Sequence, residues 1–292
     1  MTMPVTAAER EGTLGIICGG GSLPFAVADA VARRGRPVVL FALRGWADPQ
    51  AVERYPHHFI ELGQYGRFRR LAIEAGCREF VMIGKVLRPA LRQIRFDWPT
   101  IRHLPGILAM FRGGDGHLLS TLGRMFEAEG FRLLGAHEVA PEILMPQGAL
   151  GRRMPSDRDR ADIARGIALL AATGPFDIGQ AVVVAQNHVL AVEAAEGTDQ
   201  LLERIAQLRS EGRIRAPLGT GVLVKAPKSG QDRRLDLPSI GPPTVAGAAR
   251  AGLAGIAVVA GAAVIAEADQ VAAAADEAGL FVIGIPPEAS AA

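Results

Sequence analysis

Short apolar runs alternate with longer segments of helical periodicity along the first half of this chain. Residues 13–18 form the first apolar run, and a glycine-rich turn leads from it into residues 25–34, where apolar residues recur at helical spacing. Later apolar runs have the length and composition of buried strands, at residues 37–43, 58–62, 79–83 and 131–134. Helical periodicity covers residues 64–75 and 117–130. Strands that alternate with helices in this way predict a parallel, doubly wound sheet.

The second half continues this alternation after a segment typical of a linker. Residues 148–155 are rich in Gly, Pro and charge, and Ser156 is placed to cap a helix that ends near Thr173. Further apolar runs predict strands at residues 181–185, 189–193, 221–225, 255–259 and 280–285. We therefore predict an α/β protein of two α/β domains joined by a linker. They are an N-terminal Rossmann-like domain with a parallel sheet, the linker and a C-terminal α/β catalytic domain, at residues 1–147, 148–155 and 156–292.

The composition is that of a globular α/β protein. Hydrophobic residues make up 49% of the chain and aromatic residues only 5%, so aliphatic side chains supply most of the apolar surface, as buried parallel sheets require. Lys and Arg number 32 against 30 Asp and Glu, and the net charge is +2. Because wholesale nucleic-acid binding needs a dense basic face, we expect no nucleic-acid partner.

The cysteines and the N-terminal residues bear on location. Cys18 and Cys77 each lie in or beside an apolar run, which predicts small buried thiols in a reducing compartment. Residues 1–12 lack the apolar core of a secretory signal, and no apolar segment reaches membrane-spanning length. These features predict a cytoplasmic protein, which can still rest on a membrane surface.

A loop that follows the run at residues 221–225 gathers most of the candidate chemistry. Its charged residues lie between Gly and Pro residues: Lys225, Lys228, Asp232, Arg233, Arg234 and Asp236. In α/β proteins, loops at strand ends face the crevice where ligands bind. Lys and Arg suit phosphate oxygens, whereas paired carboxylates suit a hard divalent cation. The loop therefore indicates a phosphorylated substrate handled with a metal; the alternative is a solvated loop whose charges pair with one another.

A second candidate site is the turn formed by Gly19, Gly20 and Gly21, between a predicted strand and a predicted helix. Backbone N–H groups in such a turn can bind an anion. The dinucleotide fingerprint G-x-G-x-x-G is not met, because Pro24 stands where the third glycine belongs, and there is no Walker lysine. Lys85 follows another predicted strand and could meet a ligand held by the turn. The alternatives are a tight strand-to-helix connection without ligand and a solvated lysine.

Residues 88–112 combine basic side chains with apolar and aromatic ones, and Asp97 is the only acid among them. A segment of this kind suits an anionic, lipid-bearing surface or substrate. The alternative is a contact with a second subunit, which would make the protein a homodimer, or packing between domains.

Four stretches of the sequence resemble one family closely. They are IICGGGSLP (residues 16–24), FVMIGKVLRP (80–89), GDGHLL (114–119) and GVLVKAPKSGQDRRLDLPSIGPPTV (221–245). The family is that of the UDP-2,3-diacylglucosamine pyrophosphatases of the LpxI type, which act in lipid A assembly in Gram-negative bacteria. The likeness extends over nearly the whole chain. The last stretch is long and unusual in composition, which makes chance agreement improbable.

The resemblance implies two domains joined by a linker, with the lipid substrate between them. It implies hydrolysis of UDP-2,3-diacylglucosamine to lipid X and UMP, with Mg²⁺ or Mn²⁺ as cofactor. Because such a substrate has acyl chains anchored in a membrane, we expect reversible contact with an anionic membrane surface. The expected location is the cytoplasm, peripheral to the inner membrane.

The reaction that the resemblance implies assigns a role to each candidate residue. Asp232 and Asp236 are the expected catalytic residues and metal ligands, and Asp232 is the first choice. The residues expected to bind phosphate or substrate are Lys225, Lys228, Gln231, Arg233, Gly19, Gly20, Gly21, Lys85, Gln186, Asn187 and Thr198. For Gln186, Asn187 and Thr198, the alternative is that they satisfy their own turns.

Two other classes of function stay open on the sequence alone. One is another nucleotide-sugar or NAD-linked enzyme that uses the glycine turn. The other is a non-catalytic protein that binds lipid or nucleotide and turns nothing over.

Overall fold

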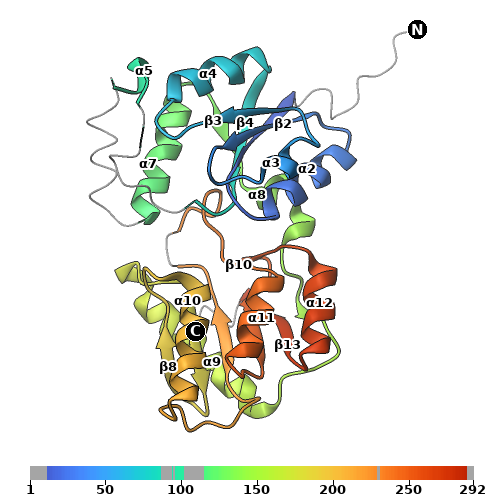
Figure 1. Ribbon diagram of the computed structural model, residues 1–292, viewed down its shortest axis with the longest axis vertical. Helices are drawn as coiled ribbons and strands as arrows, with labels where there is room; N and C mark the ends of the chain where they lie inside the picture. The colour runs from blue at the N-terminus through green and yellow to red at the C-terminus, as the bar shows by residue number, and fades with distance from the viewer. Residues whose placement is uncertain (1–11, 87–93, 95, 102–114, 229–230, 288–292) are drawn as a thin grey trace. The chain divides into compact units, whose positions relative to one another are not determined.

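The computed structural model describes residues 12–86, 94, 96–101, 115–228 and 231–287 (Figure 1). The chain folds into two compact units. The first consists of Met1–Glu142 and Asp232–Asp236, and the second of Ile143–Gln231 and Leu237–Ala292. Most of residues 88–112, the segment expected to suit an anionic lipid surface, lies outside the described residues, including its arginines Arg88, Arg92, Arg95, Arg102 and Arg112.

The first unit contains a five-stranded sheet in the order β3-β2-β1-β4-β5, in which all neighbouring strands are parallel. The strands are β1 (Thr13–Cys18), β2 (Val38–Leu43), β3 (His57–Ile60), β4 (Cys77–Ile83) and β5 (Arg132–Leu133). This order confirms the predicted Rossmann-like domain. In such sheets the strand order reverses between β1 and β4, which is where doubly wound proteins bind their ligands.

Helices accompany this sheet: α2 (Leu23–Arg33), α3 (Pro49–Val52), α4 (Tyr65–Glu74), α5 (Trp98–Ile101), α7 (Asp115–Ala128) and α8 (Ala136–Val139). A short 3-10 turn, η2 (Pro141–Ile143), follows α8. One core cluster joins Phe68 of α4 and Phe126 of α7 to Phe41 and Phe80 of the strands. Because aromatic rings pack edge to face, this cluster fixes α7 on the sheet.

The second unit contains a mixed six-stranded sheet in the order β6-β13-β11-β9-β7-β8. The strands are β6 (Gly148–Ala149), β7 (Ala181–Ala185), β8 (His188–Val192), β9 (Val222–Lys225), β11 (Gly255–Val259) and β13 (Phe281–Ile285). The neighbours β9, β11 and β13 are parallel, whereas β7 runs antiparallel to β9 and β6 antiparallel to β13. A separate parallel pair joins β10 (Ser239–Ile240) to β12 (Val264–Ile265).

The two faces of this sheet differ in their helical cover. One core cluster includes residues of α10 (Gly197–Ser210), α11 (Pro242–Arg250) and α12 (Ala268–Glu277). The cluster on the other face draws its helical residues from α9 (Asp157–Thr173), which is followed by η3 (Gly174–Phe176). Ser156 and Asp159 form a capping box at the start of α9, which confirms the predicted cap.

The segment predicted as an interdomain linker is part of the second unit. Ala149 pairs with Ile283 in an antiparallel bridge, Leu150 N–H donates to Val282 O, and Pro155 is buried. The division between the units instead falls at Glu142 and Ile143. Gly and Pro mark irregular chain, but they do not distinguish a free linker from one docked on a sheet edge.

The cysteines and the helices agree with the sequence on two further points. Cys18 and Cys77 are buried free thiols, as predicted, and burial raises the pKa of each, to about 12 and about 11. Within the described ranges, no helix combines the length and apolar character needed to cross a bilayer.

Candidate functional site

The turn at Asp232–Asp236 belongs to the first unit, although the chain on both sides of it belongs to the second. Leu235 joins the aromatic core of the first unit, and a Cβ placed on Gly123 of α7 would lie 3.3 Å from Leu235 Cδ1. Arg234 forms an ion pair with Glu127 of α7, with 2.7 Å between the charged atoms. Contacts with one helix therefore hold the turn. This finding differs from the prediction that Asp232 and Asp236 lie in the C-terminal domain.

Arg234 surrounds the carboxylate of Asp232 with donors. Its backbone N–H and Nε each lie 3.0 Å from Asp232 Oδ1, and its Nη2 lies 2.8 Å from Oδ2. These hydrogen bonds, above all those of the side chain, hold the pKa of Asp232 below its ordinary value although partial burial opposes them. The side-chain hydrogen bonds to Asp232, followed by the one to Glu127, raise the pKa of Arg234. Asp232 is therefore an oriented carboxylate that stays ionised at neutral pH.

His137 of α8 lies in the electrostatic field of this turn. Burial, followed by the charge of Arg233, lowers its pKa, while Glu138 and Asp232 act in the opposite direction. Its ring packs over Gly135, where an added Cβ would lie 2.2 Å from the imidazole Cε1. Its Nδ1 is buried and has no hydrogen-bond partner among the described residues. His137 therefore favours its neutral form, and the Asp232 carboxylate is one of the charges that act on it.

Metal ligands were predicted at Asp232 and Asp236. These residues share one turn, since Asp236 N–H donates to Asp232 O at 3.1 Å. In the part of the chain that the structure describes, no group of three or more His, Cys, Asp or Glu side chains could hold a metal ion by itself. Mg²⁺ commonly binds one or two carboxylates, together with water and phosphate oxygens of the substrate. The two carboxylates therefore fit a metal ion whose remaining ligands are water and oxygens of a bound diphosphate.

A buried polar network lies at the end of β9 in the second unit. Lys225 is only 6% exposed, and its Nζ donates to Thr198 Oγ1 at 3.0 Å and to Ser239 O at 2.8 Å. Thr198 in turn donates to Glu193 Oε1 at 2.7 Å. Glu193 also accepts the N–H of Gln180 at 2.7 Å. The structure therefore brings two predicted binding residues, Lys225 and Thr198, together in a network that joins β9, α10 and the start of β10.

Lys228 and Gln231 also lie in the second unit and contact each other. Gln231 Oε1 accepts the backbone N–H of Lys228 at 2.8 Å. The ammonium of Lys228 pairs with Asp177, with 2.6 Å between Nζ and Oδ1. Both residues therefore take part in the structure of their loop. Their predicted role towards phosphate stays a prediction.

The glycine turn after β1 is closely paired with the loop after β4. Gly19 N–H donates to Ile83 O and Gly20 N–H to Lys85 O, both at 2.9 Å, and Lys85 N–H returns a bond to Gly20 O at 2.8 Å. A Cβ on Gly84, which has a φ of +106°, would lie 2.8 Å from the backbone of Gly19. The N–H groups of Gly19 and Gly20 are therefore used within this pairing, and the predicted role of Gly19, Gly20 and Gly21 towards phosphate stays a prediction. Gly21 follows them with a φ of +90°.

Gln186 and Asn187 form the two-residue turn between β7 and β8. Both have positive φ, as the tight turn of a hairpin requires. Their N–H groups donate to the buried carboxylate of Asp162, at 3.0 and 2.5 Å. Since β7 runs antiparallel to β9, this turn lies at the opposite end of the sheet from Lys225. The structure therefore does not bring these residues together with Lys225.

Each unit thus contributes a separate group of the predicted residues. The first contains Gly19, Gly20, Gly21, Lys85, Asp232, Arg233 and Asp236, and the second contains Gln186, Asn187, Thr198, Lys225, Lys228 and Gln231. Sequence reasoning missed two residues beside Asp232. Arg234 was named only as a charged residue of the loop, and its position two residues after Asp232 is the signal for the interaction. His137 has no comparable signal, because only the fold brings it near the turn.

The chain is similar to known proteins along most of its length. Residues 13–143 match the family described as the LpxI N-terminal domain, and residues 146–283 match the LpxI C-terminal domain. A relative named UDP-2,3-diacylglucosamine pyrophosphatase LpxI, from Caulobacter vibrioides, is 42% identical over 275 residues. The alignment covers 94% of this chain and 98% of that relative. The two family matches meet between residues 143 and 146, next to the boundary between the units.

Proposed function

The chain belongs to the LpxI family, and from this premise we propose that it hydrolyses the diphosphate bond of UDP-2,3-diacylglucosamine. One water is consumed, and the products are 2,3-diacylglucosamine 1-phosphate, which is lipid X, and UMP. In this role the protein serves lipid A biosynthesis. The observation that carries the proposal is the similarity to a relative of that name over 94% of the chain.

Asp232 is the proposed catalytic residue. Hydrolysis of a diphosphate needs a group that orients water or removes its proton, and positive charge that neutralises the phosphate oxygens. Arg234 keeps the Asp232 carboxylate ionised and limits its rotation by binding both of its oxygens. Arg233, which directly follows Asp232, supplies positive charge on the same turn. The turn thus combines a fixed base with a cation.

We further propose that Mg²⁺ or Mn²⁺ is bound by Asp232 and Asp236 together with oxygens of the substrate diphosphate. When bound, the metal would neutralise the phosphate oxygens and make the phosphorus more electrophilic. The two carboxylates on one turn support this assignment.

The test is an assay of UMP release from UDP-2,3-diacylglucosamine in detergent. We expect UMP with Mg²⁺ present, loss of UMP formation with EDTA, and recovery when Mg²⁺ or Mn²⁺ is added in excess. If UMP formation persists in EDTA, the proposed hydrolysis stands and the proposed metal requirement is rejected. Substrate binding without UMP would instead favour a carrier, and turnover of soluble nucleotides alone would favour another nucleotide-dependent enzyme.

The protein is also proposed to contact an anionic membrane surface reversibly, because its substrate carries acyl chains. Trp98 and Ile101 of α5 lie within the basic and apolar segment, and their side chains are exposed, Trp98 by 77%. An exposed indole is well suited to a membrane interface, where one part of the ring is apolar and the other meets water. Exposure of two large apolar side chains on one short helix supports the proposal.

Replacing Trp98 and Ile101 by Ser should reduce sedimentation with phosphatidylglycerol vesicles, and added salt should weaken the remaining binding by screening. Activity on substrate embedded in vesicles should fall several-fold more than activity on substrate dispersed in detergent. Leu218→Ser is the matched control, since Leu218 is equally exposed but lies in the second unit. Unchanged vesicle binding would reject this surface, and a change from dimer to monomer would show a subunit contact instead.

A further inference from the structure

Helix α5 is fixed on the first turn of α4, within the first unit (Figure 1). The first N–H groups of a helix have no partner inside the helix. In α4, two of them donate to the segment of α5 instead. Arg67 N–H donates to Asp97 Oδ2 at 3.0 Å, and Tyr65 N–H donates at 2.9 Å to Oγ1 of Thr100, which is buried. The segment of α5 therefore caps α4.

Asp97 holds α5 in this position through both oxygens of its carboxylate. Oδ2 accepts the N–H of Arg67, while Oδ1 accepts the N–H of Thr100 at 3.0 Å and also its hydroxyl. The N–H of Asp97 itself donates to Gly63 O at 3.1 Å. Asp97 is the only acid among residues 88–112. The one negative charge of this basic segment is therefore bound within the protein, where it connects two helices.

The place where α5 rests determines which residues of α4 lie next to it. A Cβ on Gly66 would lie 2.5 Å from Pro99 Cγ, so α5 covers α4 at Gly66. Arg70 and Ile73 follow Gly66 by four and seven residues, so they share its face of the helix. At a rise of about 1.5 Å per residue, this face continues about 10 Å past Gly66. Helix α5 therefore lies at one end of a face that α4 continues.

This surface, the α4–α5 face, combines exposed apolar side chains with arginines. Its residues are Trp98, Ile101, Ile73, Arg67 and Arg70. The apolar members are 77%, 42% and 55% exposed, in that order. Glu74 is the only acid of α4, and it lies 4.0 Å from Arg70. Both side chains of that pair are more than half exposed, so solvent screens it, and the guanidinium can bind another anion.

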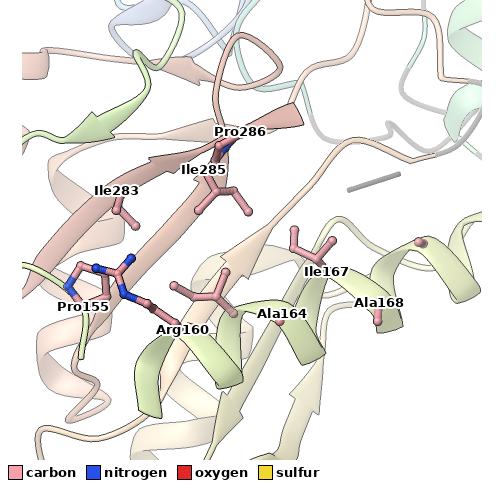
Figure 2. Close-up of a pocket in the computed structure, with 10 residues that line it drawn as sticks. Pro155, Arg160, Ala164, Ile167, Ala168, Ile283, Ile285 and Pro286 are labelled. Carbon is pink, nitrogen blue, oxygen red and sulfur yellow. The ribbon is translucent and has the colours of Figure 1, made fainter. Parts of the chain in front are cut away.

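Apolar side chains by themselves select no partner. The pocket between α9 and β13 of the second unit is an example, because Arg160 is the only charged residue among the described residues that line it (Figure 2). On the α4–α5 face, arginines accompany the apolar groups. Arginine suits lipid phosphates, and an indole suits the interface between headgroups and acyl chains. The face is therefore complementary in charge and polarity to an anionic bilayer.

We propose that the α4–α5 face binds an anionic phospholipid bilayer. Arg67 and Arg70 bind phosphates of the headgroups, and the apolar side chains enter the interface. Asp97 is the positioning residue that keeps α5 on this face. The proposal rests on the membrane contact of the proposed function, and it extends that contact from α5 to α4.

The first test measures sedimentation with vesicles of phosphatidylglycerol and phosphatidylcholine. Arg67→Gln combined with Arg70→Gln should weaken binding at least about tenfold, because each basic residue near an anionic surface contributes about fivefold. Arg33→Gln combined with Arg54→Gln is the matched control, since both arginines are exposed and lie in the first unit outside α4 and α5. The control should bind within about threefold of wild type, because salt limits the reach of surface charges.

The second test separates the position of α5 from net charge. Asp97→Ala removes a negative charge, which by itself favours an anionic vesicle, but it should weaken binding at least about fivefold because α5 is no longer held on α4. Asp97→Asn keeps an oxygen acceptor and should bind more tightly than Asp97→Ala. Asp48→Ala is the matched control, since Asp48 caps α3 by accepting the N–H of Gln50 at 3.0 Å. Its loss should not weaken vesicle binding.

UMP release in detergent should stay within about threefold of wild type in all these variants, and circular dichroism checks their fold. If wild type releases no UMP but the variants lose vesicle binding as expected, the proposed hydrolysis fails and the docking surface stands.

Three results would overturn the docking surface. They are equal binding by the two double variants, binding by Asp97→Ala as tight as that of wild type, and no sedimentation of wild type with the anionic vesicles. A change from dimer to monomer in the Arg67 and Arg70 variant would also overturn it, in favour of a subunit contact.

Discussion

Replacing Asp232 by Ala is expected to reduce kcat for UMP release on the order of 10³-fold or more. The carboxylate is ionised and oriented by hydrogen bonds from Arg234. The variant should keep its fold, because Arg234 retains Glu127 and Leu235 retains its apolar contacts. The measurement is steady-state UMP release together with thermal unfolding followed by circular dichroism.

Asp276→Ala provides the matched control for this variant. Asp276 also pairs with an arginine, Arg152, and its side chain is 24% exposed against 28% for Asp232. Loss of such a pair costs about 0–1 kcal/mol of stability, so activity should stay within a few-fold of wild type. If Asp232→Ala retained a rate within tenfold of wild type, Asp232 would have no part in the chemistry.

Replacing Lys225 by Met is expected to destabilise the protein by about 2–4 kcal/mol, because it removes a buried charge from the partners that surround it. Ser239 O and Thr198 Oγ1 would each lose a donor, and Glu193 would stay buried beside them. Met keeps most of the volume of the lysine stem. The measurement is the free energy of unfolding in urea.

Lys228→Met is the control for the structural role of Lys225, because Lys228 is another lysine predicted to bind phosphate. The Lys228 side chain is 16% exposed and its partner Asp177 is 42% exposed, so the loss of stability should be about 1 kcal/mol, less than for Lys225. A stable but inactive Lys225→Met variant would contradict the structural role. It would restore the prediction that Lys225 binds substrate phosphate.

Most of the fold could be predicted from periodicity, because buried strands and amphipathic helices leave local patterns. The run at residues 221–225 predicted β9, and the Ser156 cap marked the start of α9. Burial of a lysine at the strand end could not be predicted in this way. Lys225 depends on Thr198, 27 residues away, and the distance in sequence hides that contact.

The candidate site could be predicted only in part, because some of its contacts join residues that are far apart in the sequence. The charge pattern around Asp232 indicated its loop, but the helix that holds the loop precedes it by more than a hundred residues. The contacts of Arg234 and Leu235 with the first unit, and the electrostatic effect of Asp232 on His137, appear only in the folded structure. Gln186 and Asn187 stay predicted binding residues, and sequence alone does not separate that role from a structural one, because the same polar types are favoured in tight turns.

The assignment of Asp232–Asp236 to the first unit affects how this protein can be dissected. The chain passes between the units three times, after residues 142, 231 and 236, so no single cut separates them. A fragment ending at Glu142 would include α7 but lack the five residues that dock on it. A fragment starting at Ile143 would carry those residues without the helix that holds them. Complementation between separately expressed halves would therefore have to rebuild this docking, not only bring two finished domains together.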